Sequence, residues 1–344
     1  MKLGLALGYW FAGPPAGVGE QVAAAEDLGF DSVWSAEAYG SDCFTPLAWL
    51  GAGTTTLRLG TAVCQLSART PTSTAMTALT LDHLSEGRFM LGLGASGPQV
   101  VEGWYGQPYP KPLARTREYV EVIRRILARE EPLDFQGEFY HHPLTGPGTT
   151  DLGKPLKSIT HPRRADLPIL LGAEGPKNVA QTAEIADGWL PIFLSPKTDP
   201  MYRAYLDEGF ARPGARRTWD DFEIPNLVTM VVDDDVEKAA DVVRMSLGFY
   251  IGGMGAREVN FHADVFSRMG YEAEVNKIQD LFLEGHKDEA IASVPLSLVE
   301  DVALVGPRDK VLGELEAWKE TCITTLLVAG PPRFLEQAAG IVNG

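Results

Sequence analysis

The sequence predicts an α/β protein built as a single (β/α)8 TIM barrel with insertions. Short apolar runs rich in Leu, Val and Thr alternate with stretches whose apolar residues recur at helical spacing. Eight such strand-then-helix units fit within the 344 residues, a length that suits one barrel. A doubly wound sheet is the alternative, but such folds usually divide into two halves, and no linker divides this chain.

The central unit, residues 57–97, shows the alternation most clearly. Residues 57–64 form an apolar run, residues 72–84 have helical periodicity that stops at Gly87, and residues 88–93 form a second apolar run. Strand, helix and strand with short connections are the unit of a parallel sheet. We therefore expect the two strand ends, residues 62–65 and 94–99, to lie side by side where ligands bind.

The other elements follow in order along the chain. Further strands are expected at residues 3–9, 31–35, 167–172, 188–194, 222–232 and 321–328, and helices at 18–28, 44–53, 113–129, 176–186, 201–210 and 334–342. Residues 98–111 are expected to form a long loop. Two stretches exceed what a barrel unit needs: a Gly- and Pro-rich segment with a hairpin near FQGEFYHHP, residues 132–166, and a mostly helical segment, residues 236–302. We expect both to be insertions in one domain that spans residues 1–344, the second closing the pocket or extending an oligomer contact.

Composition narrows the function classes. The net charge of −16 disfavours a nucleic-acid binder, which would show a basic face. The three cysteines are widely spaced, and His141 and His142 have no partners at ligand spacing, so neither a disulfide framework nor a metal site is expected. No apolar run approaches ~18 residues, so no membrane span is expected. With no signal peptide recognised, a cytoplasmic protein is the expectation.

Four phrases carry a resemblance to a known family. They are LGTAVCQLSARTP, LDHLSEGRFMLGLGASGP, REYVEVIRRIL and PILLGAEGPKNVAQTAEIADGW. Together and in this order, these phrases resemble the bacterial luciferase-like family of flavin- and deazaflavin-dependent oxidoreductases. The resemblance spans nearly the whole chain and implies a (β/α)8 barrel. The spacing is most similar to members that use the deazaflavin coenzyme F420, with FMN as the alternative cofactor.

The resemblance implies a platform for the flat ring of the coenzyme at the end of the third strand. In the family this platform is a bulge with a cis non-prolyl peptide, which matches Ala62–Val63 here. Small side chains suit such a bulge, and the residues concerned are Thr61, Ala62, Val63, Cys64 and, beyond them, Gln65. From the residues alone, an ordinary buried strand end is the more economical interpretation.

A second coenzyme contact is implied after the fifth strand. The segment opens a helix, and exposed backbone N–H groups at a helix N-terminus suit a phosphate. The residues are Gly172, Ala173, Glu174, Gly175, Pro176 and Lys177. A plain strand-to-helix turn is the alternative, and Glu174 would repel an anion unless it points away.

Glu37 and Tyr9 are the candidates for catalysis, although no acid–base pair is evident. Glu37 matches a family position that often carries an acidic residue near the ring. Sugar-phosphate dehydrogenases of the family have Asp-His there, whereas this chain has Glu37-Ala38, and Gly97-Pro98 replaces their catalytic Glu. That reaction is therefore not expected. Arg69 is expected to meet the anionic part of the coenzyme, with an ion pair near Asp82 or Glu86 as the alternative.

Aromatic residues after the predicted strands could wall an apolar substrate pocket. Those expected to bind substrate are Trp10, Tyr39 and Trp104, with Tyr9 and Tyr105 nearby. A basic cluster comprising Lys154, Lys157, His161, Arg163 and Arg164 could attract the acidic tail of the coenzyme. Its position before a strand counts against this, because such loops lie opposite the active site. A solvated loop is the alternative.

The sequence therefore predicts an oxidoreductase that transfers a hydride between coenzyme F420 and a small organic substrate. Two alternatives remain: an FMN-dependent monooxygenase of the same fold, and a non-catalytic barrel that binds flavin or deazaflavin. The resemblance also favours a homodimer.

Overall fold

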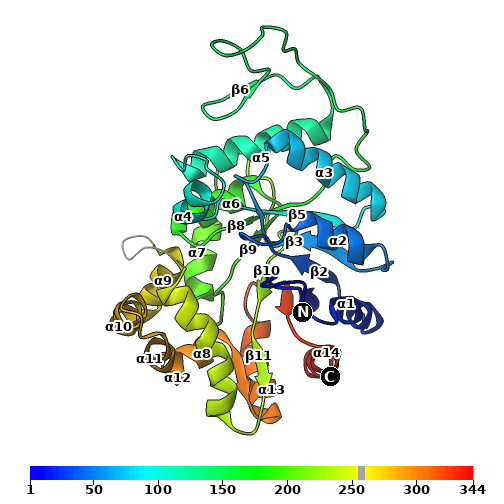
Figure 1. Ribbon diagram of the computed structural model, residues 1–344. Coiled ribbons are helices and arrows are strands. Elements are labelled where there is room, and N and C mark those ends of the chain that lie inside the picture. The colour runs from blue at the N-terminus through cyan, green and yellow to red at the C-terminus, as the bar shows by residue number, and fades with distance from the viewer. Residues whose placement is uncertain (255–259, 344) are drawn as a thin grey trace.

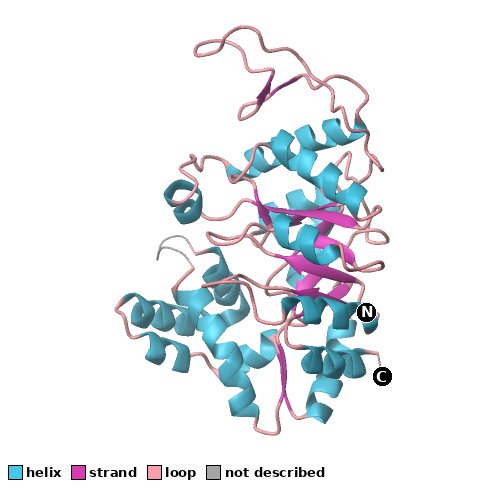
Figure 2. Ribbon diagram, turned by 45° about the vertical axis from the view of Figure 1, so that its right-hand side comes forward, coloured by secondary structure: helices cyan, strands magenta, loops and turns pink. Residues whose placement is uncertain are grey.

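A parallel β-barrel forms the centre of the computed structural model, which describes residues 1–254 and 260–343. Its strands follow the spatial order β10 (Pro225–Leu227), β13 (Thr325–Val328), β1 (Lys2–Ala6), β2 (Ser32–Ser35), β3 (Arg58–Thr61), β5 (Phe89–Gly94), β8 (Ile169–Gly172) and β9 (Gly188–Leu190). A parallel bridge between Gly188 and Glu223 closes the ring, and the Trp189 N–H donates to the Glu223 carbonyl at 2.8 Å. Figure 2 shows these strands as the inner layer. The predicted TIM barrel is confirmed.

Helices cover the outside of the barrel. They are α1 (Val18–Asp27), α2 (Phe44–Gly51), α3 (Pro71–Leu84), α5 (Pro112–Ala128), α6 (Pro176–Ile185), α7 (Asp199–Phe210), α13 (Arg308–Lys319) and α14 (Pro332–Val342). α14 packs beside α1, so the two ends of the chain meet on one side of the barrel (Figure 1). Inside the ring, apolar side chains from five of the strands form a buried cluster of Trp34, Met90, Leu170, Leu190 and Leu327.

Both long segments project from the barrel (Figure 1). The first carries a small hairpin of β6 (Phe135–Gln136) and β7 (His141–His142). The second is helical and comprises α8 (Val236–Gly252), α9 (Phe261–Phe266), a π-helical turn η1 (Ser267–Tyr271), α10 (Glu272–Leu283), α11 (Lys287–Ala292) and α12 (Leu296–Val302). These helices bury an apolar cluster of their own, to which Phe193 from the barrel contributes. Among the described residues no helix is long and apolar enough to span a membrane.

Two predicted elements differ from the structure. The stretch expected to be a loop, residues 98–111, begins with a short helix, α4 (Pro98–Gly103). The stretch expected to be one strand, residues 222–232, is two: β10 lies in the barrel, whereas β11 (Met230–Val232) pairs with β12 (Leu304–Gly306) outside it. The chain leaves the barrel between β10 and β11 because the helical insertion starts and ends on this small sheet. The barrel helix α13 therefore follows the insertion.

Candidate active site

The chain forms a bulge between β3 and the two-residue strand β4 (Cys64–Gln65), at the carboxyl end of the barrel. The peptide bond between Ala62 and Val63 is cis, as the resemblance implies. Thr61 fastens the bulge to β5, because its hydroxyl donates to the Gly92 carbonyl at 2.7 Å and accepts from the Gly92 N–H at 2.8 Å. Ala62 and Val63 are half-buried and pack on the apolar cluster inside the ring. They form a small apolar platform at the barrel mouth.

Glycines on the neighbouring strands make room for this platform. A Cβ added to Gly94 would come within 2.4 Å of Val63 Cγ2. A Cβ added to Gly172, at the end of β8, would lie 3.2 Å from Val63 Cγ1. The bulge is thus in contact with the carboxyl ends of two other strands, and Gly172 connects it to the segment that was expected to bind phosphate.

Glu37 and Arg69, both expected to contact the coenzyme, form an ion pair with each other. Arg69 Nη2 lies 2.7 Å from Glu37 Oε1, and Nη1 lies 2.9 Å from Oε2. The second oxygen also accepts the backbone N–H of Gln65 at 2.9 Å, and the Gln65 amide donates to the Glu37 carbonyl at 3.1 Å. Burial alone would lower the pKa of Arg69, but the hydrogen bonds to Glu37 raise it overall. Because both carboxylate oxygens are engaged, Glu37 is placed to hold β4 rather than to accept a substrate proton.

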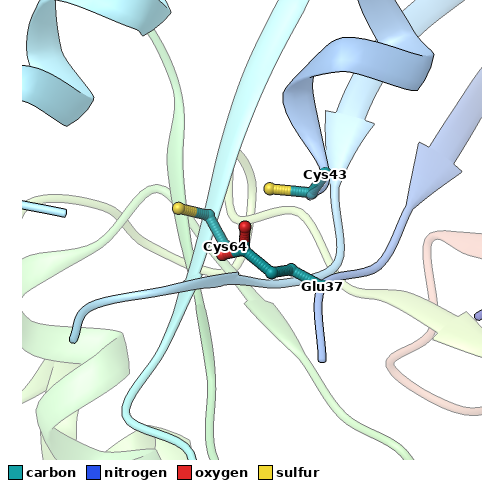
Figure 3. Close-up of side chains that lie close together, drawn as sticks. All are labelled: Glu37, Cys43 and Cys64. Carbon is teal, nitrogen blue, oxygen red and sulfur yellow. The ribbon is translucent and has the colours of Figure 1, made fainter. Parts of the chain in front are cut away.

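Two buried cysteines, Cys43 and Cys64, lie beside Glu37 of this ion pair (Figure 3). The Cys43 and Cys64 sulfurs and a Glu37 oxygen all lie within 4.8 Å of one another. Burial raises the pKa of the Cys43 thiol, and the neighbouring Cys64 raises it further. Arg69 donates to the Cys64 sulfur at 3.6 Å. Since a guanidinium already neutralises the carboxylate, this group of possible ligands disfavours a metal cation.

The segment after β8 opens the N-terminus of α6. No side chain caps this helix, its N-cap residue is Gly175, and a Cβ there would meet no atom within 4 Å. Pro176 and Lys177 are exposed. An uncapped helix N-terminus with open space before it can receive an anionic group. The carboxylate of Glu174 lies against His262 of the helical insertion, so its negative charge need not oppose an anionic group at this helix N-terminus.

Glu174 pairs with a residue that the sequence did not single out. His262, on α9 of the helical insertion, places Nδ1 2.7 Å from Glu174 Oε1. The His262 ring lies edge-on to the rings of Phe193 and Tyr250, with centroids 6.0 Å and 4.9 Å apart. These residues are distant in sequence, and no periodicity or motif links them. Only the folding of the insertion over the barrel brings them together.

Tyr9 lies at this same edge of the mouth, just after β1, and forms a hydrogen bond with Tyr250 of α8. Burial of its hydroxyl raises the pKa of Tyr9, although the residue as a whole is 40% exposed. Burial likewise raises the pKa of Tyr250. At neutral pH both hydroxyls therefore remain protonated.

The predicted substrate-binding aromatics gather at the rim. Tyr39 and Trp104 are exposed, and their ring centroids lie 6.3 Å apart. Tyr105 donates to the Ala38 carbonyl at 3.2 Å. Trp10 lines an open hollow of about 480 Å³ between the loops after β1 and β2.

The basic cluster lies away from the site. Arg164 pairs with the buried Asp82 at 2.9 Å and donates to the carbonyl of Phe89, where β5 starts. His161 accepts a hydrogen bond at its carbonyl from the His83 ring, and Lys157 donates to a backbone carbonyl. The start of a barrel strand is the end opposite the active site. The hypothesis that this cluster attracts the coenzyme tail is therefore not supported, and Arg164, rather than Arg69, neutralises Asp82.

A flat ring system with an anionic side chain fits these features. Ala62 and Val63 offer an apolar support, and the open N-terminus of α6 lies next to them through Gly172. The carboxylate Oε2 of Glu174 is buried without a hydrogen-bond partner among the described residues. An orphaned polar atom of this kind marks a place where a ligand or solvent is expected.

The parallel barrel and its cis bulge are features of one class of protein. Comparison with known families identifies that class. Residues 7–325 match the family model of the luciferase-like monooxygenases, and the chain belongs to this family.

Individual relatives can then be named. The chain is 58% identical over 343 residues, 99% of each chain, to a Mycobacterium tuberculosis protein provisionally named a coenzyme F420-dependent oxidoreductase. It is 29% identical to the 5,10-methylenetetrahydromethanopterin reductase of Archaeoglobus fulgidus, over 90% of this chain and 87% of that one. The solved structure of the coenzyme F420-dependent tetrahydromethanopterin reductase from Methanopyrus kandleri superposes with a TM-score of 0.79 at 22% identity, covering 99% and 98% of the two chains. An F420-dependent secondary alcohol dehydrogenase superposes with a TM-score of 0.74 at 18% identity, covering 99% and 98%.

Proposed function

We propose that this chain is a coenzyme F420-dependent oxidoreductase that moves a hydride between the deazaflavin and a small organic substrate. The observation that carries the proposal is the cis bulge at Ala62–Val63, at the mouth of a barrel whose 58% identical relative bears an F420-dependent name. When bound, the deazaflavin supplies the hydride chemistry. The residues of this chain provide placement and the exclusion of water.

The proposed roles of individual residues follow from their positions. Ala62 and Val63 support the ring, and Cys64 and Gln65 continue the wall beside it. The segment 172–177 receives the phosphate at the start of α6. Glu37 and Arg69 hold β4 in place as a buried pair. Trp10, Tyr39 and Trp104 shape the rim through which substrate enters.

Three finer statements belong to the same proposal. The whole chain forms one domain, which the single family match over residues 7–325 supports. The protein acts in the cytoplasm, since its three cysteines are buried and free, as expected in a reducing compartment. It acts as a homodimer, which rests on the family resemblance alone and is testable by sedimentation.

Titration with each cofactor tests the proposal. Coenzyme F420 is expected to bind at micromolar concentration, measured by its own fluorescence, and FMN is expected not to bind. Tight FMN binding, followed by oxygen uptake once the flavin is reduced, would instead establish the monooxygenase alternative. F420 binding without turnover of a broad panel of carbonyl and enone compounds would establish a non-catalytic carrier.

A further inference from the structure

We propose that His262, oriented by Glu174, is the group that exchanges a proton with an oxygen atom of the substrate. This inference rests on the proposed function and adds to it the class of substrate: a ketone, or the secondary alcohol formed from it. Neither His262 nor Glu174 is among the residues that the sequence offered for catalysis, which were Glu37 and Tyr9.

The position of His262 is the first argument. Its partner Glu174 stands two residues beyond Gly172, where an added Cβ would lie 3.2 Å from Val63 Cγ1 of the ring platform. Phe193 follows β9, and Tyr9, which bonds to Tyr250, follows β1. The imidazole is therefore surrounded by residues that follow three barrel strands, although it belongs to the insertion. This is the end of a barrel at which reactions occur.

The orientation of the ring is the second argument. Nδ1 faces Glu174 Oε1 at 2.7 Å, at an angle that does not satisfy hydrogen-bond geometry in this state. A carboxylate at one ring nitrogen holds the proton there and leaves the other nitrogen for substrate. No partner for His262 Nε2 exists among the described residues, and the side chain is 21% exposed. Contacts of this kind often tighten only when substrate binds.

The other ionisable side chains around His262 and Glu174 are less suited to exchange a proton than an imidazole is. The ionisable side chains facing the pair are Tyr250 from α8, Tyr9 after β1, Tyr202 from α7 and Arg268 from η1, which donates to the Glu174 carbonyl at 3.4 Å. Burial raises the pKa of Tyr9, Tyr202 and Tyr250, so these phenols stay protonated. Imidazole is the side-chain group that in general both gives and takes a proton near neutral pH, and His262 is the imidazole at this position.

The proposed step balances in the direction of ketone reduction. The carbonyl carbon gains a hydride, the π pair of the C=O bond moves to oxygen, and that oxygen takes the proton from His262 Nε2. A ketone, one hydride and one proton thus give a secondary alcohol, and the imidazolium becomes a neutral imidazole. The two electrons come from the reduced deazaflavin of the proposed function.

A footprint of histidine reactivity tests the position without turnover. Diethyl pyrocarbonate modifies accessible imidazoles, and mass spectrometry locates the product. Saturating coenzyme F420 is expected to slow modification of His262 at least tenfold, because the ring lies beside the coenzyme pocket. The exposed His286 of the insertion is the matched control and keeps its rate. Equal rates at His262 with and without the coenzyme would overturn the proposal.

Kinetics test the chemical role, with a panel of ketones that begins with acetone and cyclohexanone. We expect H262Q to lower kcat about 100-fold or more with KM within threefold, the range of a lost acid–base group. E174Q is expected to lower kcat about tenfold and H286Q to change nothing, and H262Q and H286Q are expected to bind coenzyme F420 within twofold of the native protein. Imidazole in the buffer should restore part of the activity of H262A, which a purely structural loss would not allow.

The outcomes separate the two proposals. A native protein that fails to bind coenzyme F420 refutes the proposed function. A native protein that binds it but reduces no ketone refutes the substrate class assigned here. Full activity in H262Q, or absence of rescue of H262A, refutes the role of His262 and leaves the oxidoreductase proposal intact.

Discussion

At the scale of single residues, Glu37 and Arg69 form a buried ion pair beside the ring platform. Glu37 is 5% exposed and accepts hydrogen bonds from Arg69 and from the backbone of Gln65. A carboxylate in this setting has its hydrogen-bonding capacity satisfied by its neighbours. It holds the strand that follows the ring platform, and so acts on the site through the backbone.

Replacing Glu37 with Gln is expected to destabilise the protein by about 3 kcal/mol or more, because it leaves the half-buried Arg69 without its counter-charge. Urea unfolding measures this change. The control is E138Q, which breaks the exposed pair of Glu138 and Lys111 and should cost less than ~1 kcal/mol. Equal costs for the two variants would show that Arg69 finds another partner, such as Asp42, whose carboxylate lies 4.0 Å from it.

At the scale of elements, close packing of strands makes the bulge possible. β5 lies against β3 through Gly92, where an added Cβ would meet the Thr61 carbonyl oxygen at 1.8 Å. That atom is backbone and belongs to the bulged strand, so it cannot rotate away as a side chain could. The glycines in FMLGLG are therefore needed for two reasons: they let β5 lie close to β3, and they leave room for the bulge that forms the platform.

G92A is expected to push β3 away from β5, to cost about 1–3 kcal/mol as an overpacked site, and to weaken coenzyme F420 binding. Urea unfolding and fluorescence titration measure the two effects. In the control G340A, within α14, an added Cβ meets nothing within 4 Å, so stability should stay level or rise by up to ~1 kcal/mol. If G92A is destabilised but binds coenzyme F420 with unchanged affinity, the exact position of the platform is not required for coenzyme binding.

At the scale of the whole molecule, ion pairs tie together the end of the barrel opposite the site. Arg58 bridges Asp31 at 2.6 Å and Glu223 at 2.8 Å, which joins β3 to the start of β2 and to the closing segment of the ring. Asp187, before β9, pairs with Arg124, Arg216 and Arg217. Burial alone would raise the pKa of Asp187, but the charge of Arg124 lowers it overall. The ion pairs that stabilise the barrel and the candidate site thus lie at opposite ends of the same strands.

The helical insertion and the barrel are expected to unfold in one transition, since Phe193 of the barrel packs in the insertion core. All seven tryptophans lie outside residues 236–302, so their fluorescence reports on the barrel alone. Far-ultraviolet circular dichroism reports on the helices of both parts. Coincident urea transitions by the two probes would support one domain, whereas an earlier transition in circular dichroism would divide the chain into two.

Much of this protein was predictable from its sequence, for reasons that are local. Apolar runs, helix periodicity and Gly87 after α3 act over a few residues, so the barrel strands and helices could be placed in order. The resemblance carried by the family phrases implied the cis bulge at Ala62–Val63, whereas the small residues there were also consistent with an ordinary strand end. The strand expected at residues 222–232 was wrong in part, because pairing with β12, some seventy residues further on, decides where β10 ends and β11 begins.

The sequence by itself determined the fold class and the family, and it predicted the barrel end that carries the site, because these depend on patterns and phrases within short segments. Tertiary structure alone decided which side chains meet there. In the folded chain Glu37 pairs with Arg69, Glu174 with His262, and Asp82 with Arg164. Charged partners are chosen by proximity in space after the chain has folded, and no spacing along the sequence encodes a contact between residues 174 and 262.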